Sequence, residues 1–124
     1  MPIDLLAKFS VTQKTSPEDG IELFEKFIAG DEPVLLSYKH SRDRVVFTNR
    51  KIIAMDAQGI TGKKKSFCIF PYSKISSFSV ETAGTFDLDS DLKIWVSGVG
   101  VFGVKLGKKI DISAIGKLLS EHVK

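Results

Sequence analysis

Short apolar runs, closely spaced along the chain, constrain the fold of this protein more than any other feature. Between Arg44 and Val80, β-branched and aromatic residues gather in runs that are too short for helices and are separated by turn residues. Asn49 supplies one turn, and Gly59 with Gly62 supplies the next, because Asn and Gly adopt the positive φ of tight hairpins at little cost. Strands joined by such short connections pair antiparallel. The stretch therefore predicts an antiparallel meander.

The pattern extends beyond the meander and predicts seven strands in all. In the later part of the chain, Leu92 and Ile94 alternate with Lys93 and Trp95, which indicates a strand buried on one face only. The connections are short, so neighbouring strands are again expected to be antiparallel. The predicted ranges are 34–40, 43–48, 50–55, 65–70, 74–81, 92–96 and 101–106.

A helix is predicted on each side of these strands. Ser16 is a good N-cap and Pro17 suits the first helical position, so residues 17–29 are expected to form a helix. Near the C-terminus, Asp111 or Ser113 caps a second amphipathic helix. The apolar faces are formed by Ile21, Phe24, Phe27 and Ile28 in the first helix and by Ile112, Ile115, Leu118, Leu119 and His122 in the second.

Length and composition fit one domain. With 124 residues, of which 43% are hydrophobic, the chain is long enough to bury a core without metal or disulfides. We divide it into an N-terminal arm, 1–15, in which residues 3–9 are a turn of helix or extended, and a domain, 16–124. The single cysteine, Cys68, cannot form an internal disulfide and fits a reducing compartment. No apolar run approaches the ~20 residues that cross a bilayer, and the start lacks a secretion signal, so we expect a cytoplasmic protein.

Two motifs suggest cofactor or metal sites, but in both cases the neighbouring residues do not fit such a site. Residues 98–103 match G-x-G-x-x-G, but a strand follows where dinucleotide binding requires a helix. Residues 87–91 begin like a calcium loop, yet Leu92 and Gly98 stand where that loop requires Gly and Glu. Cys68 lies in an apolar run with no histidine placed as its base. We expect no cofactor, no metal and no catalytic residue.

Four stretches of sequence carry a family resemblance. They are 42–50 (RDRVVFTNR), 56–65 (DAQGITGKKK), 69–84 (IFPYSKI and FSVETAG) and 91–98 (DLKIWVSG). Together with the order of strands and final helix, they resemble the bacterial pleckstrin-homology (PH) domain family. The resemblance implies a mainly β fold: a PH-like seven-stranded antiparallel barrel or sandwich capped by a C-terminal helix, here with an extra N-terminal helix. It also implies a stand-alone, non-enzymatic protein that assembles into homo-oligomeric rings, and it does not carry over the lipid binding of eukaryotic PH domains.

Several predicted strands are apolar on both faces, whereas a small barrel buries only one face of each strand. The second face is covered either by the chain itself, through the helix 17–29 or the arm 3–9, or by a neighbouring subunit of a cyclic assembly. The resemblance favours the subunit, so we expect a homo-oligomeric scaffold that binds itself and other proteins. Candidate interface anchors are Trp95, Ile53, Met55, Phe67 and Phe70.

Positive charge concentrates in the middle of the chain. Residues 37–74 hold nine Lys or Arg against two acids, a net charge of +7. In PH domains that bind inositol phosphates, the first hairpin carries a Lys and then basic-x-Arg, and Lys39, Arg42 and Arg44 are similarly placed. The simpler interpretation is that lysines decorate exposed turns and that Arg44 pairs with a neighbouring acid. The alternative function is peripheral binding of phosphate head groups or anionic surfaces, through Lys39, Arg42, Arg44, Lys63, Lys64 and Lys65. Nucleic acid is not expected, because the basic stretch lacks aromatics spaced for base stacking.

Overall fold

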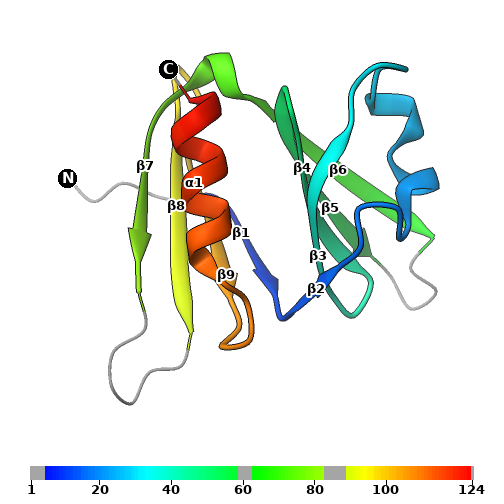
Figure 1. Ribbon diagram of the computed structural model, residues 1–124, viewed down its shortest axis with the longest axis horizontal. Helices are drawn as coiled ribbons and strands as arrows, with labels where there is room; N and C mark the ends of the chain where they lie inside the picture. Colours follow the sequence, from blue (N-terminus) through cyan, green and yellow to red (C-terminus); the bar gives the residue numbers. More distant parts are fainter. Residues whose placement is uncertain (1–4, 59–62, 83–88, 124) are drawn as a thin grey trace.

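Two β-sheets pack face to face, and one α-helix packs against their shared core (Figure 1). The computed structural model describes residues 5–58, 63–82 and 89–123. One sheet has the strand order β1-β9-β8-β7 and the other has the order β2-β3-β4-β5-β6. The strands are β1 (Leu5–Val11), β2 (Gln13–Thr15), β3 (Val34–His40), β4 (Asp43–Thr48), β5 (Lys51–Gln58), β6 (Lys64–Pro71), β7 (Ile75–Glu81), β8 (Ser90–Val96) and β9 (Gly100–Leu106).

The seven predicted strands are present as β3 to β9, and β3 and β4 have the predicted bounds. As predicted, consecutive strands pair antiparallel within β3 to β6 and within β7 to β9. The G-x-G-x-x-G match is a hairpin turn in which Gly98 has φ 75°, and strand β9 continues directly from it. The predicted turn at Gly59 and Gly62 lies outside the described residues, as does the beginning of the calcium-like stretch 87–91.

Two further strands at the N-terminus extend both sheets. β1 pairs with β9 and β2 pairs with β3, so the chain passes from one sheet to the other at Thr12. The Thr12 amide donates to the Lys39 carbonyl oxygen at 3.0 Å, and the Gly107 amide donates to the Val11 carbonyl oxygen at 2.9 Å. β1 runs parallel to β9, a pairing that joins opposite ends of the chain. The sequence predicted either a turn of helix or an extended segment for this part of the arm, and the described residues are extended.

The main core lies between the sheets and beneath α1 (Ile112–His122), the predicted C-terminal helix. Asp111 Oδ1 accepts a hydrogen bond from the Ser113 amide at 2.9 Å. Of the two predicted N-cap candidates, Asp111 and Ser113, Asp111 is therefore the N-cap. Within the described residues, no helix is long and apolar enough to span a membrane. The residues of α1 buried in the core are Ile115, Leu118 and Leu119.

The predicted N-terminal helix over 17–29 is wrong. These residues form two short 3-10 helices instead, η1 (Ile21–Leu23) and η2 (Glu25–Phe27). Gly20 adopts the left-handed conformation, with φ 71° and ψ 14°, and a right-handed helix cannot run through it. The apolar residues at 21, 24 and 27 recur every third position, a spacing that suits the three residues per turn of a 3-10 helix.

We call residues 16–33 the strap, because they lie across the outer face of the five-stranded sheet (Figure 1). Phe24 of the strap is fully buried on that face together with Val46, Ile53 and Met55, and the four residues form a second apolar core. The chain itself therefore covers this part of the face, which is one of the two alternatives that the sequence left open. The partly buried residues around this second core are Leu23, Phe27, Ile28, Val34 and Phe67.

Candidate functional site

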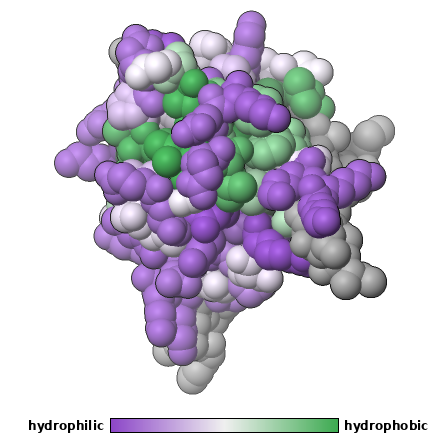
Figure 2. Space-filling view, turned by 90° about the vertical axis from the view of Figure 1, so that its right-hand side faces the viewer, coloured by the Kyte–Doolittle hydropathy of each residue, from purple (hydrophilic) through white to green (hydrophobic). Residues whose placement is uncertain are grey.

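An apolar patch marks the outer edge of the five-stranded sheet. The ring centroids of Phe27 from the strap and Phe67 from β6 lie 4.7 Å apart, and both side chains are partly exposed. Ile69, two residues further along the same face of β6, is 38% exposed. Figure 2 faces this side of the molecule and shows apolar residues gathered among hydrophilic ones. We call Phe27, Phe67 and Ile69 the apolar patch.

Trp95 lies on β8, in the other sheet. It is half-buried and belongs to the outer face of that sheet, because its neighbours Ile94 and Val96 are part of the main core. Its register partners are Ser77 on β7 and Val101 on β9. The apolar patch and Trp95 thus lie on the outer faces of two different sheets.

The five predicted interface anchors fall into two groups. Ile53, Met55 and Phe70 are at most 6% exposed. The first two lie beneath the strap, and Phe70 lies in the main core between the sheets. These three side chains are covered within the chain. Trp95 and Phe67 are the two anchors that keep part of their surface exposed.

Three of the six predicted basic residues come together around one hollow, which has a volume of about 350 Å³. Arg42, Arg44 and Lys65 are its basic lining residues, and we call it the basic hollow. The hollow lies where the β3–β4 hairpin, the β5–β6 strands and the strap meet. Its other lining residues are Leu23, Ser41, Met55 and Ala57, whereas Lys39, Lys63 and Lys64 are not part of the described wall.

Arg44 already holds an acidic partner beside this hollow. Its Nη1 donates to Asp19 Oδ2 at 3.1 Å and to the Asp19 carbonyl oxygen at 3.0 Å. Arg44 is also the register partner of Lys39, and like charges placed opposite each other across a ladder repel. Asp19 offsets part of that repulsion. Asp43, the neighbouring acid in the sequence, instead accepts a hydrogen bond from the Ala57 amide at 2.9 Å.

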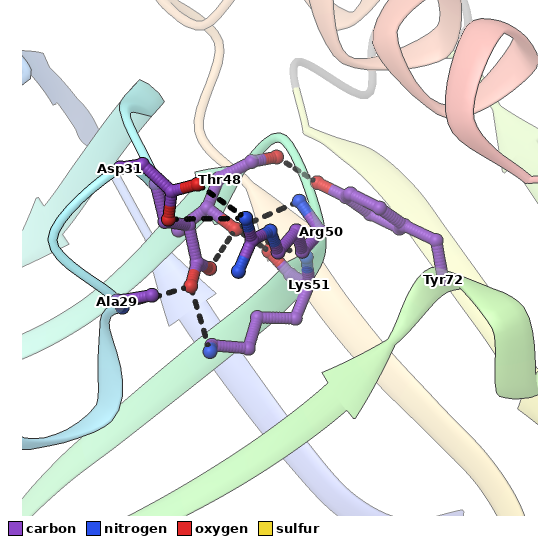
Figure 3. Close-up of polar contacts among 7 residues, drawn as sticks. Ala29, Asp31, Thr48, Arg50, Lys51 and Tyr72 are labelled. Carbon is purple, nitrogen blue, oxygen red and sulfur yellow. Dashed lines mark hydrogen bonds and ion pairs between the residues drawn. The ribbon is translucent and has the colours of Figure 1, made fainter.

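A buried carboxylate that the sequence reasoning missed ties the end of the strap to the sheet (Figure 3). Glu32 Oε1 accepts hydrogen bonds from the Ala29 amide at 3.1 Å and from Lys51 Nζ at 3.0 Å. Thr48 Oγ1 donates to Glu32 Oε2 and accepts from the backbone amides of Arg50 and Lys51. Burial by itself raises the pKa of Glu32, but the hydrogen bonds from Thr48, Ala29 and Lys51 and the positive charge of Lys51 outweigh burial, so the pKa is lowered. Glu32 is therefore a structural anion.

Two buried tyrosines differ in whether the hydroxyl has a partner. Tyr72 Oη donates to the Thr48 carbonyl oxygen at 2.8 Å (Figure 3). Tyr38 Oη has no hydrogen-bond partner among the described residues. Burial raises the pKa of both side chains, that of Tyr38 to about 12, so both hydroxyls stay protonated at neutral pH.

Replacing each tyrosine with phenylalanine is expected to have a different effect on stability. Tyr72→Phe leaves the Thr48 carbonyl oxygen without its donor, and we expect the free energy of unfolding to fall by about 1 to 2 kcal/mol. Tyr38→Phe removes a hydroxyl that was buried without a partner, and we expect no loss or a gain of up to about 1 kcal/mol. Urea denaturation of the two variants measures the difference. Equal losses would contradict the hydrogen-bond assignment.

Groups that could carry out catalysis are poorly placed for it. Burial raises the pKa of the half-buried Cys68 thiol, which disfavours the thiolate that a nucleophile requires. His40 Nδ1 lies 3.0 Å from Thr12 Oγ1, and His122 Nδ1 lies 2.8 Å from the Leu118 carbonyl oxygen, so within the described residues Nδ1 of each ring faces a hydroxyl or a carbonyl and not a carboxylate. The described part of the chain holds no group of three or more His, Cys, Asp or Glu side chains that could bind a metal ion.

The two sheets and the C-terminal helix define a PH-like β-sandwich, and solved structures share this arrangement. The chain is similar to the crystal structure of a DUF1696 family protein with a pleckstrin-homology domain from Shewanella loihica PV-4, with a TM-score of 0.81 and 37% sequence identity over 90% of this chain and 96% of the other. It is also similar to the pleckstrin-homology domain from Shewanella amazonensis SB2B, with a TM-score of 0.71 and 36% identity over 89% and 90% of the two chains.

The family model of the bacterial PH domain matches residues 5–123, and the chain belongs to the bacterial PH domain family. It is 30% identical over 115 residues to the uncharacterized protein YozO of Bacillus subtilis (strain 168), which is 93% of this chain and 96% of YozO. It is 54% identical over 82 residues to the uncharacterized protein YjqA of the same strain, a match that spans 66% of each protein. The fold and the family predicted from the resemblance are confirmed, and the activity has to be argued from the surface.

Proposed function

We propose that this protein is a cytoplasmic, non-enzymatic PH-like module that self-assembles into a homo-oligomeric ring and acts as a protein-binding scaffold. The apolar patch carries the proposal, because Phe27, Phe67 and Ile69 keep apolar surface exposed beside the part of that face that the strap covers. Apolar patches rimmed by polar residues commonly mark interaction sites. Membership of the bacterial PH domain family supports a binding module rather than an enzyme.

A ring needs two different contact surfaces on each subunit, because a head-to-tail contact repeated by rotation closes into a cyclic assembly. The apolar patch and Trp95 belong to different sheets and therefore offer two such surfaces. Aromatic side chains often dominate the energy of protein interfaces. We assign the apolar patch to one half of the subunit contact and Trp95 to the other.

Light scattering on a sizing column tests the assembly. We expect the wild type to run as a discrete multiple of the 13.7 kDa chain and both Ile69→Arg and Trp95→Ala to run as smaller species. Leu35→Arg is the matched control, because Leu35 is 37% exposed against 38% for Ile69 but lies on β3 beside α1. It is expected to assemble as the wild type does.

A monomeric wild type would contradict self-assembly. An assembly that withstands both Ile69→Arg and Trp95→Ala would contradict the two assigned surfaces and leave the assembly itself standing.

The second candidate function is binding of phosphate head groups or anionic surfaces, and the basic hollow is the observation that favours it. The hollow brings Lys65 of β6 together with Arg42 and Arg44 of the β3–β4 hairpin, from which it is separated in the sequence by β5. Arginine binds phosphate oxygens through several parallel N–H groups, which suits a concave site. The second half of the predicted basic set, Lys39, Lys63 and Lys64, would add only a diffuse positive field.

Co-sedimentation with anionic vesicles at low and at moderate salt tests this second function. We expect binding that weakens as salt rises, because salt screens exposed charges. Lys65→Glu is expected to weaken binding strongly, whereas Lys117→Glu, the same charge change on the exposed side of α1, is expected to have a small effect. If the protein bound the vesicles at neither the low nor the moderate salt concentration, this function would be contradicted.

A further inference from the structure

Arg44 links the basic hollow to the strap. It lies on β4, its side chain is 15% exposed, and it forms part of the wall of the hollow. Asp19 of the strap, whose side chain is 45% exposed, accepts hydrogen bonds from Arg44 Nη1 with both its carboxylate and its backbone carbonyl oxygen. An anion that enters the hollow therefore meets an arginine that already holds a carboxylate.

The strap is shaped to let the guanidinium group approach closely. A Cβ atom on Gly20 would lie 2.6 Å from Arg44 Cζ and 2.7 Å from Arg44 Nη1, closer than side chains can pack. Gly20 also has φ 71°, a conformation that residues with a Cβ rarely adopt. The turn is held by the Asp19 amide, which donates to the Ser16 carbonyl oxygen at 3.1 Å, and by the Leu23 amide, which donates to the Gly20 carbonyl oxygen at 3.0 Å. In the closed turn, Asp19 therefore faces Arg44.

We propose that Asp19 is a built-in competitor for an oxyanion ligand of the phosphate class. Its carboxylate occupies the position on Arg44 Nη1 that a phosphate oxygen would take, so the ligand binds as Asp19 leaves. The inference rests on the anion-binding candidate above and adds to it a gate on the basic hollow. The gate is the first part of the strap, residues 16–23.

The rest of the strap stays in place when the gate opens. Phe24 is fully buried in the second core, and Glu32 ties the end of the strap to Thr48 and Lys51. The segment before Phe24 is held less firmly, because no residue of η1 is buried, Ile21 is 37% exposed and Leu23 packs against the second core with only part of its surface. Opening therefore requires the loss of one ion pair, whose carboxylate is 45% exposed, and of the partial packing of Leu23. Breaking such a pair changes the equilibrium constant for opening by a factor of about five or less.

Ligand binding and opening of the gate are linked equilibria. The Asp19 carboxylate therefore lowers the affinity for the ligand by the same factor by which bound ligand shifts the gate toward its open form. Removing the Asp19 charge while keeping its shape should therefore tighten anion binding. The probe is inorganic pyrophosphate, and its affinity is measured by isothermal titration calorimetry. We expect Asp19→Asn to bind about fivefold more tightly than the wild type and Arg44→Gln to lose binding.

Asp31→Asn is the matched control. Asp31 is also a strap carboxylate paired with an arginine, at 3.0 Å from Arg50 Nη2, and its replacement changes the net charge equally. Asp31 is not part of the wall of the hollow, so the variant is expected to bind pyrophosphate as the wild type does.

Hydrogen exchange supplies a second readout that a mere charge effect would not move. Pyrophosphate is expected to speed amide exchange in residues 16–23 of the wild type and to leave residues 29–32 unchanged. In Asp19→Asn, residues 16–23 are expected to exchange fast without any ligand. Equal pyrophosphate affinity in wild type and Asp19→Asn, with no change in exchange, would overturn the gate and leave anion binding intact.

Vesicles of phosphatidylcholine with phosphatidic acid replace pyrophosphate in a parallel series. The same ranking of variants with vesicles but not with pyrophosphate would assign the ligand to a lipid head group, and the reverse would assign it to a free phosphate. Failure of every variant to bind either probe would overturn both the anion-binding function and the gate.

Discussion

Replacing Phe24 with alanine is expected to lower the free energy of unfolding by about 3 kcal/mol or more, the largest effect that we expect from a single change in the strap. The Phe24 side chain is fully buried, and its ring packs edge-on against Phe67 with the ring centroids 6.0 Å apart. Val46, Ile53 and Met55 complete the second core around it. Alanine would remove most of these contacts and leave a cavity that the sheet below cannot fill.

The observed loss also depends on how the strap responds. If the strap detached locally without Phe24, the loss would be limited to the free energy that the whole strap contributes, because the main core does not need it. The Glu32 cluster holds the far end of the strap in place, so we expect the cavity to form and the larger loss to appear.

Urea denaturation followed by tryptophan fluorescence measures this loss. Trp95 is the one tryptophan and lies on the other sheet, so its signal reports unfolding of the whole domain. Ile21→Ala is the control on the same strap, since Ile21 is 37% exposed and its truncation should cost less than about 1 kcal/mol. A loss for Phe24→Ala as small as that of the control would mean that the strap is not part of the folded core.

The strands and the C-terminal helix could be predicted because their signals are local. Each signal involves residues only a few positions apart in the sequence. Examples are the alternation of apolar and polar residues along β8, the turn residues between strands and the N-cap at Asp111. The parallel pairing of β1 with β9 could not be predicted in this way. It joins residues from the two ends of the chain, and hydrophobic pattern carries no information on a distant partner.

The strap shows how a local signal can point to the wrong element. Apolar residues at 21, 24, 27 and 28 fit an α-helix, and a single glycine such as Gly20 costs a helix only about 1 kcal/mol. The left-handed conformation of Gly20 serves a distant residue, because Arg44 packs against the position where a side chain would be. The helix was therefore overridden by a tertiary contact that no window of sequence contains.

The candidate site was predictable in part for the same reason. Of the five anchors expected from the pattern, Phe67 and Trp95 keep part of their surface exposed. Ile53 and Met55 lie on the outer face of the sheet but beneath the strap, and Phe70 lies in the main core, because an apolar run on both faces of a strand does not say which face is covered. The pattern did not identify Glu32, because an acid in a loop usually reaches solvent. Only the fold brings Thr48 and Lys51 to it, from the β4–β5 turn.

Replacing Glu32 with glutamine is expected to lower the free energy of unfolding by about 2 kcal/mol at neutral pH, the second large effect that we expect. Glutamine has nearly the same shape, but it is neutral and it can accept at only one side-chain oxygen. Lys51 then loses its charged partner, and either Thr48 or the Ala29 amide loses its acceptor. Hydrogen bonds to charged groups contribute about 1.5 to 3 kcal/mol, whereas Lys51 is 19% exposed and recovers part of its loss in water.

The matched control for this change is Asp31→Asn. Asp31 pairs with Arg50 at 3.0 Å in the same turn, but its side chain is 78% exposed. Exposed pairs contribute little, so this variant should lose less than about 0.5 kcal/mol. A similar loss in both variants would contradict the special role that we assign to the buried carboxylate.

The effect of Glu32→Gln should also disappear in acid, and the direction follows from the lowered pKa of Glu32. In the unfolded chain the carboxylate titrates near its ordinary value of 4.5, and in the folded chain it titrates at lower pH. The stabilisation from the charged form is therefore fully present above pH 4.5 and is lost as the pH falls through the folded pKa. Protonated Glu32 resembles glutamine, so urea denaturation in steps from neutral pH to about pH 3 should show the two curves of stability converging. A gap that stayed constant over this range would mean that the network stabilises the fold through its shape and not through the charge of Glu32.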